Sequence, residues 1–377
     1  MPASKQVYRL SEARELRGLT VSELSQEIGV SRQAVYRYEN GTQMPSPDIL
    51  QNICSSLRFP ITFFSSPRTS QNISDRPVFF RDMKTNQEKY RKIAYRWLQI
   101  LCDQVTCFEK YLDLPAVSLP DFDISDPSEL TYEDIDIIAE RLRKFWGLGN
   151  GPIDNVTQLL ENNGFIVFRK YIEAEKMDAC SLIVNGRPYI LVNTYKHTCS
   201  RDIMNLAHEV GHVILHQSIS SMDIMNSSCF DKLEDQAWRF AKSFLMPPTV
   251  FQHEVGYPTL RHFVTLKSRW RTSIASMIMY CCDLGIIDEA KKQYFFREMT
   301  RMKIRKQEPL DDELPIESSS LLRDCESIMV SNGMFTKQEL FESTSLNEHD
   351  YCELLNLPYD YLAPKQVRPI LRLVPNN

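Results

Sequence analysis

Two histidines spaced four residues apart are the side chains in this sequence best suited to hold a metal ion. His208 and His212 lie in the stretch N-L-A-H-E-V-G-H-V-I-L-H, with Glu209 directly after the first of them. On a helix, residues at i and i+4 share a face, so both imidazoles can bind one ion. Glu209 would then lie beside that ion, where it can accept a proton from a metal-bound water. The motif predicts a hydrolytic Zn²⁺ site; the alternative is a buried helix that carries histidines by chance.

A catalytic zinc ion needs three protein ligands and one open position. His216 is one turn beyond His212, but a straight helix carries it too far along the axis to reach the same ion. A downstream carboxylate, Glu234, is the better candidate, because it shares a predicted helical face with Ala237 and Ala241. Such small side chains would let the second helix pack closely against the first. We therefore predict Glu234 as the third ligand.

Both stretches have the pattern of buried helices that could position these side chains. In the first, Gly211 costs about 1 kcal/mol relative to Ala inside a helix, so its presence indicates close packing. The second runs from Leu233 to Leu245 with apolar residues at helical spacing, and Pro247 and Pro248 end it. The residues that flank the histidine motif are also apolar: Leu206, Ala207, Val210, Val213, Ile214 and Leu215.

The chain resembles the ImmA/IrrE family of bacterial zinc metallopeptidases in two linked motifs. These are H-E-V-G-H-V-I-L-H and, downstream, E-D-Q-A-W-R-F-A-K-S-F-L-M-P. The resemblance implies a zinc metalloendopeptidase with Zn²⁺ as its cofactor and Glu209 as its general base. The metal ligands that it implies are His208, His212 and Glu234.

One position departs from the family pattern. Trp238 occupies a site where the family usually has Asn or Asp, a polar residue that supports a ligand histidine. Partners of this kind orient the ligands and tune the metal, and Trp cannot accept a hydrogen bond there. Asp235 is the nearby residue that could take over the role.

The first 65 residues predict a five-helix DNA-binding unit. Thr20 and Glu23 form a capping box at the second helix, and Ser31 is placed to cap a third helix that ends at Asn40-Gly41. The stretch T-V-S-E-L-S-Q-E-I-G-V-S-R-Q-A-V-Y-R-Y-E-N-G resembles the XRE-type helix-turn-helix family, whose third helix reads the major groove of double-stranded DNA. The side chains expected to contact DNA are Arg32, Gln33, Tyr36 and Arg37. A helical bundle used for protein contacts is the alternative.

The pattern as a whole predicts an α+β fold that is mostly α. A hairpin is expected at Asn185-Gly186, within a small sheet that precedes the metal helix. Tyr189–Asn193 is our candidate for an edge strand that pairs with a substrate peptide. A long helix, Gln87–Leu112, is expected to act as a brace or dimer contact. The predicted domains are a helix-turn-helix domain (1–65), a linker with the long helix (66–129), a zincin-like domain (130–309) and a helical C-terminal extension (310–377).

The composition and charge of the chain limit its possible binding partners and its expected location in the cell. The net charge of −5 argues against a chain-wide polyanion binder, so contact with DNA must be local. The ten cysteines form no C-x-x-C pair, and the chain lacks an apolar run long enough for a membrane span or signal peptide, so we expect a cytoplasmic protein. The basic run Arg297–Lys306 indicates a solvated face, with a contact to DNA or a partner as the alternative, and Asp311–Ser320 indicates an acidic linker.

These expectations combine into a DNA-binding transcriptional regulator with site-specific zinc endopeptidase activity. By resemblance, its substrate would be a repressor or another regulatory protein in a stress or mobile-element response. The alternative is a non-proteolytic regulator, or an antitoxin or phage-defence module, whose zincin-like domain senses a ligand or partner. A homodimer is compatible with either function. The oxyanion-stabilising residue is left open between His216 and several tyrosines.

Overall fold

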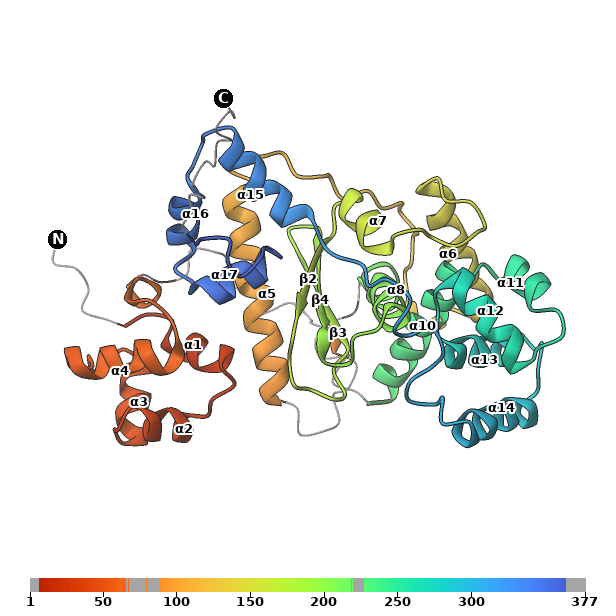
Figure 1. The fold of residues 1–377 in the computed structure, drawn as a ribbon, viewed down its shortest axis with the longest axis horizontal. Coiled ribbons are helices and arrows are strands. Elements are labelled where there is room, and N and C mark those ends of the chain that lie inside the picture. Colours follow the sequence, from red (N-terminus) through yellow and green to blue (C-terminus); the bar gives the residue numbers. More distant parts are fainter. Residues whose placement is uncertain are drawn as a thin grey trace, which may run out of the picture.

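The computed structural model describes residues 7–65, 67, 79–80, 88–217, 219 and 227–363. As predicted, the fold is mostly helical with one small sheet (Figure 1). The N-terminal bundle consists of α1 (Leu10–Leu16), α2 (Val21–Glu27), α3 (Arg32–Glu39), α4 (Pro47–Leu57) and a 3-10 turn (Ile61–Phe64). The long helix α5 (Glu88–Phe108) follows. Gln87, predicted as its first residue, lies outside the described residues.

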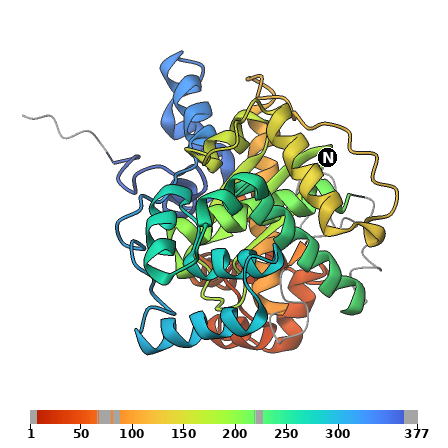
Figure 2. The same ribbon diagram turned by 90° about the vertical axis from the view of Figure 1, so that its right-hand side faces the viewer.

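The remaining elements surround the sheet and the two motif helices. The strands are β1 (Phe79–Phe80), β2 (Ile166–Lys170), β3 (Ala179–Val184) and β4 (Arg187–Asn193). The central helices are α6 (Tyr132–Phe145), α7 (Val156–Asn162), α8 (Cys199–Leu215) and α10 (Ser227–Leu245), with 3-10 turns at Pro127–Glu129 and Thr194–Lys196. The later helices are α11 (Pro248–Val255), α12 (Leu260–Trp270), α13 (Ile274–Asp283), α14 (Glu289–Arg301), α15 (Leu321–Ser331), α16 (Lys337–Thr344) and α17 (Glu348–Leu354). Figure 2 shows α11 to α14 grouped together on one side of the molecule.

The N-terminal bundle forms with the caps that the sequence predicts. The Thr20 hydroxyl accepts from the Glu23 amide, the Glu23 carboxylate accepts from the Thr20 amide, and Ser31 caps α3 by accepting from the Ala34 amide. Each bond satisfies a donor that the first helical turn would otherwise leave unpaired. Val35 is fully buried beneath α3. The spacing of buried and exposed residues along α3 is therefore that of a helix packed on one face only.

The long helix α5 joins this bundle to the rest of the chain. It packs against α1, where Arg96 donates to Glu15 at 2.7 Å, and against the sheet, where its buried Trp97 contacts Phe168. The C-terminal helices complete the same core instead of forming a separate body. Arg17 pairs with Asp350 at 2.6 Å across that contact. The N-terminal bundle and the C-terminal extension are thus both attached to the core formed by α5 and the sheet.

The sheet has the strand order β1-β3-β4-β2. The predicted hairpin joins β3 to β4, with Asn185 and Gly186 both at positive φ (51° and 79°), as a tight two-residue turn requires. Our prediction that Tyr189–Asn193 is an edge strand is wrong. These residues belong to β4, which pairs with β3 on one side and runs parallel to β2 on the other, so its backbone groups are already used.

The outer side of β3 pairs with β1, a short segment of the predicted linker. Phe79 is in register with Ser181, and Phe80 with Cys180, in an antiparallel pair. These two residues of the predicted linker therefore have a specific position at the edge of the sheet. A peptide that adds to this side of the sheet has to take the position of β1.

The helices α8 and α10 pack very closely, and Gly211 explains how. A Cβ atom at this glycine would lie 3.1 Å from the Ala237 Cα and 3.2 Å from the Ala237 carbonyl oxygen. Real side chains are rarely that close to a neighbouring backbone, so the glycine allows the approach that brings Glu234 toward α8. Within the described ranges, no helix has the length and apolar character needed to cross a bilayer.

The residues after α14 are more tightly held than an acidic linker would be. The Glu317 carboxylate accepts from the Val156 and Thr157 amides at 3.1 and 2.7 Å, at the start of α7. Glu308 does the same for Ile274 and Ala275, at 2.7 and 2.9 Å, at the start of α13. A carboxylate at a helix N-terminus satisfies unpaired amides and the helix dipole. The acidic residues therefore anchor this segment, which corrects our reading of residues 311–320 as a linker.

Candidate active site and metal centre

Helices α8 and α10 bring together the three side chains that the sequence predicts as metal ligands. The His212 Nε2 atom lies 3.0 Å from the His208 Nε2 atom and 3.1 Å from the Glu234 Oε1 atom. The His208 Nε2 atom lies 3.5 Å from the Glu234 Oε2 atom. Three potential ligand atoms thus converge on one point, from residues 26 positions apart or fewer along the chain.

These spacings fit a zinc ion. Two ligand atoms bound to a tetrahedral Zn²⁺ at about 2.1 Å lie about 3.4 Å from each other, close to the separations found here. Two neutral imidazoles and one carboxylate are also a donor set that catalytic zinc commonly has. Burial alone would raise the pKa of Glu234, but the adjacent His208 and His212 side chains outweigh it and lower that pKa well below its usual range. Glu234 is therefore a carboxylate, as a metal ligand must be.

Glu209 is buried beside this cluster, on the side that faces the sheet. Its burial raises the pKa to about 7, against the opposing influence of His212 and of the Ser181 hydroxyl on β3. Its Oε2 atom is buried with no hydrogen-bond partner among the described residues. An orphaned carboxylate oxygen is costly unless a partner fills the position, and a metal-bound water is a partner of the right chemistry.

A buried chain of hydrogen bonds, which we call the relay, orients His212 on the side of its ring that faces away from Glu234. The Gln236 Nε2 group donates to the Pro127 carbonyl at 2.8 Å, which leaves the Gln236 Oε1 atom to accept from His216 Nε2 at 3.1 Å. His216 Nδ1, 2.9 Å from His212 Nδ1, is then the acceptor for the His212 N–H. This order leaves the lone pair of His212 Nε2 free for a metal ion. Sequence reasoning rejected His216 as a ligand and missed Gln236 altogether.

This relay also removes His216 from the candidates for oxyanion stabilisation. Its side chain is fully buried, and both ring nitrogens are engaged. Burial, followed by the charge of His212, lowers the pKa of His216 well below its usual value, so the ring is neutral. His216 is a positioning residue for His212 and not a group that contacts substrate.

Trp238 takes a different role from the polar residue that the family pattern has at this position. Its ring lies against the His208 ring with centroids 4.1 Å apart and planes inclined by 36°. It therefore fixes the orientation of His208 by packing. Asp235, the suggested replacement, is exposed and accepts a hydrogen bond from Tyr132, so it does not support a ligand histidine.

Comparison with known sequence families agrees with this arrangement. Residues 10–64 match the family described as "Helix-turn-helix", and residues 164–279 match the family described as "IrrE N-terminal-like domain". The chain combines a helix-turn-helix region with an IrrE-like region. The second match contains β2 to β4, α8 and α10, and with them the whole histidine and carboxylate cluster. None of the curated proteins matches the chain.

The helix-turn-helix domain exposes the side chains predicted to contact DNA. Arg32, Gln33, Tyr36 and Arg37 are all exposed on α3, and 57% of the Tyr36 surface is accessible. The bundle packs against α5 through α1, so this contact leaves the exposed face of α3 uncovered (Figure 1). The geometry permits α3 to enter a major groove, as the family match implies.

A second group of potential ligands lies far from this centre, at His349, Asp350 and Glu353. Asp350 already pairs with Arg17, and Glu353 pairs with Lys170. These carboxylates hold the C-terminal extension against the rest of the fold. Among the described residues, the cluster on α8 and α10 is therefore the stronger candidate for a metal centre.

Proposed function

We propose that this chain is a zinc-dependent endopeptidase whose IrrE-like domain cleaves a regulatory protein and whose helix-turn-helix domain binds DNA. The observation that carries the proposal is the convergence of His208, His212 and Glu234 beside the unpartnered carboxylate oxygen of Glu209. Three ligands and an adjacent buried base are the minimum set for metal-assisted hydrolysis.

Zinc, when bound, would supply a Lewis acid that polarises the scissile carbonyl and lowers the pKa of its water. The residues of the chain do the rest. Glu209 accepts the proton of the attacking water and passes it to the leaving amine, so it acts first as a base and then as an acid. The Ser181 hydroxyl on β3 interacts with this carboxylate. Because Ser181 is also in register with β1, an extended peptide that pairs with β3 in place of β1 would lie beside Glu209.

The helix-turn-helix domain would bind DNA and bring the peptidase domain close to a regulatory protein. Arg32, Gln33, Tyr36 and Arg37 would contact base edges and phosphates of double-stranded DNA. By the family resemblance, the substrate is a regulatory protein such as a helix-turn-helix repressor, and DNA binding would place the peptidase near it. All ten cysteines are unpaired thiols, which suits the reducing cytoplasm in which such a regulator would act.

The competing function is a regulator in which the metal site has a structural or sensory role without hydrolysis. Trp238 favours this competing function, because its apolar ring lies against His208 where the family pattern has a polar residue. The two functions differ in what Glu209 has to do, because a sensor needs the ligands and not the base. A substrate search should therefore compare the protein termini of cells that carry wild type with those that carry the Glu209→Gln variant.

Replacing His208 by Ala is expected to remove most of the bound zinc from the purified protein. The variant keeps only two ligand side chains, and catalytic zinc sites use three. The measurement is zinc content per chain by mass spectrometry after gel filtration. His253→Ala, which changes an exposed histidine on α11, is the matched control and should retain the metal. Equal zinc content in the two variants would exclude His208 as a ligand.

Replacing His216 by Phe is expected to weaken zinc binding by about 10–100-fold without abolishing it. The change removes the acceptor that fixes His212 with Nε2 facing the ligand cluster, while the aromatic ring keeps most of the volume. Affinity can be measured by competition with a chromogenic chelator. Thermal unfolding of the metal-free proteins separates a loss of orientation from a loss of fold, and unchanged affinity would contradict the relay.

Replacing Arg32 or Arg37 by Ala is expected to cost about 1–3 kcal/mol of DNA-binding free energy. The operator can first be selected from genomic fragments with the wild-type protein, and binding then followed by fluorescence anisotropy at several salt concentrations. Lys110→Ala, an exposed cation outside the bundle, is the control. If all three variants bind like the wild type, α3 is not the element that reads DNA.

A further inference from the structure

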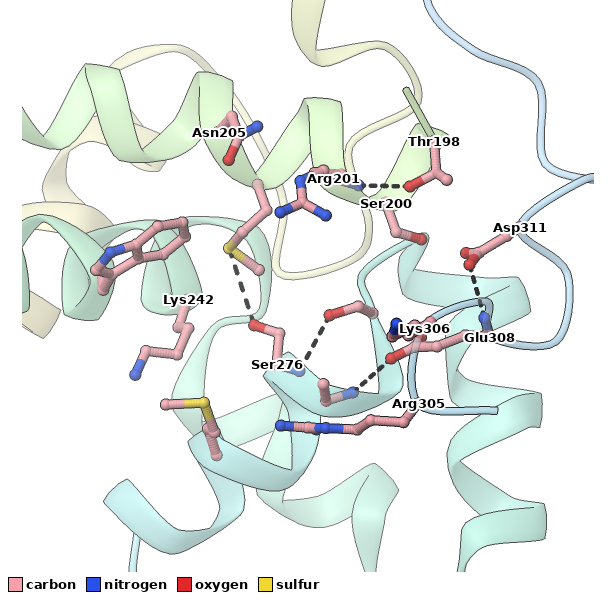
Figure 3. Close-up of a pocket in the computed structure, with 15 residues that line it drawn as sticks. Thr198, Ser200, Arg201, Asn205, Lys242, Ser276, Arg305, Lys306, Glu308 and Asp311 are labelled. Carbon is pink, nitrogen blue, oxygen red and sulfur yellow. Dashed lines mark hydrogen bonds between the residues drawn. The ribbon is translucent and has the colours of Figure 1, made fainter. Parts of the chain in front are cut away.

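A cavity of about 500 Å³ opens beside the metal centre, between α8, α10, α13 and residues 305–311 (Figure 3). Figure 3 shows Arg201 and Asn205 on the α8 side, and Arg305 and Lys306 on the opposite side. Trp238 forms part of the wall. None of these residues belongs to the group of candidate metal ligands, so the cavity is a separate feature of the site.

The cavity continues along the same helical faces that carry the ligands. Asn205 precedes His208 by three residues, and Trp238 follows Glu234 by four, so each pair shares a face of its helix. One helical turn rises about 5.4 Å, which puts Asn205 and Trp238 about one turn from the candidate ligands on their own helices. Trp238 lies against the His208 ring at 4.1 Å and also lines the cavity. A peptide lying across the metal centre could therefore place a side chain in it.

The charges around the cavity leave two cations without an acidic partner. The acidic residues in the lining, Glu308 and Asp311, both pair with the buried Lys267, at 2.9 and 2.5 Å. Two cations of the lining are neutralised in turn, because Arg201 pairs with Asp178 and Lys242 with Asp283.

Arg305 and Lys306 remain. Arg305 lies over the Phe296 ring, with its guanidinium carbon 3.9 Å from the ring centroid. The charge of Lys306 contributes only weakly to lowering the pKa of the exposed Glu175. Neither forms an ion pair with a carboxylate of the described residues. The cavity therefore carries a net positive charge that its own walls do not balance.

Two buried polar side chains line the cavity and can donate hydrogen bonds. Ser200 is 2% exposed, and its hydroxyl has no partner within the described part of the chain. Asn205 is 4% exposed and also lines the cavity. Buried polar groups are almost always satisfied in folded proteins, so the unused Ser200 hydroxyl beside a positively charged cavity points to a ligand that accepts hydrogen bonds.

We propose that this cavity selects the substrate by receiving an acidic side chain, Asp or Glu, of the protein segment that lies across the metal centre. Met204, Met279 and Trp238 line the cavity and would contact the aliphatic part of that side chain. Arg305 and Lys306 would pair with its carboxylate, and Ser200 and Asn205 would donate to it. A Lys or Arg side chain would meet uncompensated positive charge. The inference rests on the proposed peptidase function, but the binding that it describes does not require cleavage.

Binding can be tested on the zinc-loaded Glu209→Gln protein, so that the probe is not hydrolysed. The probes are paired pools of fluorescein-labelled decapeptides, randomised except at one position that holds Glu in one pool and Gln in the other. Each of the ten positions is fixed in turn, and fluorescence anisotropy gives the affinity. At one position or at adjacent positions, the Glu pool should bind at least tenfold more tightly than the Gln pool.

Charge reversal connects that preference to the cavity. The double variant Arg305→Glu/Lys306→Glu should lose the preference for Glu and acquire one for Lys at the same position. Arg301→Glu/Lys303→Glu makes the same change in charge nearby but outside the lining, and it should behave like the parent. Equal binding of the Glu and Gln pools at all positions, or a preference that survives the reversal at 305 and 306, would overturn the proposal. Tight, Glu-dependent binding without cleavage by the wild type would refute the peptidase function alone.

Discussion

Replacing Glu209 by Gln is expected to slow peptide hydrolysis by about 10²–10⁴-fold while leaving the zinc content unchanged. The amide has nearly the same shape as the carboxylate, but it cannot accept the proton of the attacking water. Glu209 is not among the three converging ligand residues, so metal binding does not depend on it. The measurement is the rate of cleavage of a substrate found by comparison of protein termini, together with metal analysis of both proteins.

The protonation state of Glu209 makes this test sensitive to the metal. Burial raises the pKa of this carboxyl to about 7. A divalent cation alongside would stabilise the ionised form and lower that pKa, so the base would be a carboxylate at neutral pH when zinc is bound. Comparison of the variants should therefore use zinc-saturated protein.

Asp235→Asn is the matched control for this experiment. It changes a carboxylate to an amide one residue from the proposed ligand Glu234, but at an exposed position where the side chain accepts a hydrogen bond from Tyr132. Its hydrolysis rate should stay within about twofold of the wild type, as expected for a surface substitution. If Glu209→Gln cleaves as fast as Asp235→Asn, Glu209 is not the catalytic base. If neither the wild type nor Asp235→Asn cleaves, the non-proteolytic regulator becomes the better account.

The parts of the fold and of the site that could be predicted from the sequence are those in which the spacing of nearby residues determines the geometry. The i, i+4 histidines and the capping residues Thr20 and Ser31 act within one or two helical turns, so their partners are visible in the sequence itself. The prediction of Glu234 was less direct. Ala237 and Gly211 indicate that two helices pack closely, but they do not show which residues of the two helices are in contact.

The parts that could not be predicted depend on contacts between distant segments. Gln236 supports His216 only because the Pro127 carbonyl fixes the orientation of its amide. The assignment of Tyr189–Asn193 as an edge strand failed for the same reason, since a periodic apolar strand has the same pattern whether one or two neighbours pair with it. The anchoring of the C-terminal extension through Arg17 and Asp350 joins residues more than 300 positions apart.

Lys267 illustrates this limit, because nothing in its sequence context distinguishes it from a surface lysine. Its side chain is fully buried and pairs with Glu308 at 2.9 Å and Asp311 at 2.5 Å. The same Glu308 carboxylate accepts from the amides of Ile274 and Ala275, so one lysine links α12, α13 and the segment that follows α14.

Replacing Lys267 by Met is therefore expected to destabilise the IrrE-like domain by about 3–5 kcal/mol. The apolar side chain fills the space, but two carboxylates, both with nearly buried side chains, are left facing each other without a cation. Urea unfolding followed by circular dichroism provides the measurement. Lys292→Met, which breaks a partly exposed pair with Glu289 on α14, is the control and should cost less than about 1 kcal/mol.

A second variant separates the loss of charge balance from the loss of packing. Adding Glu308→Gln and Asp311→Asn to Lys267→Met removes both uncompensated charges, and the Gln carbonyl can still accept from the start of α13. Much of the lost stability should return, because breaking a buried ion pair costs most when the partner charge stays behind. If Lys267→Met is no more harmful than Lys292→Met, or if the triple variant recovers nothing, the buried pair does not hold the segment that carries Arg305 and Lys306 against α13.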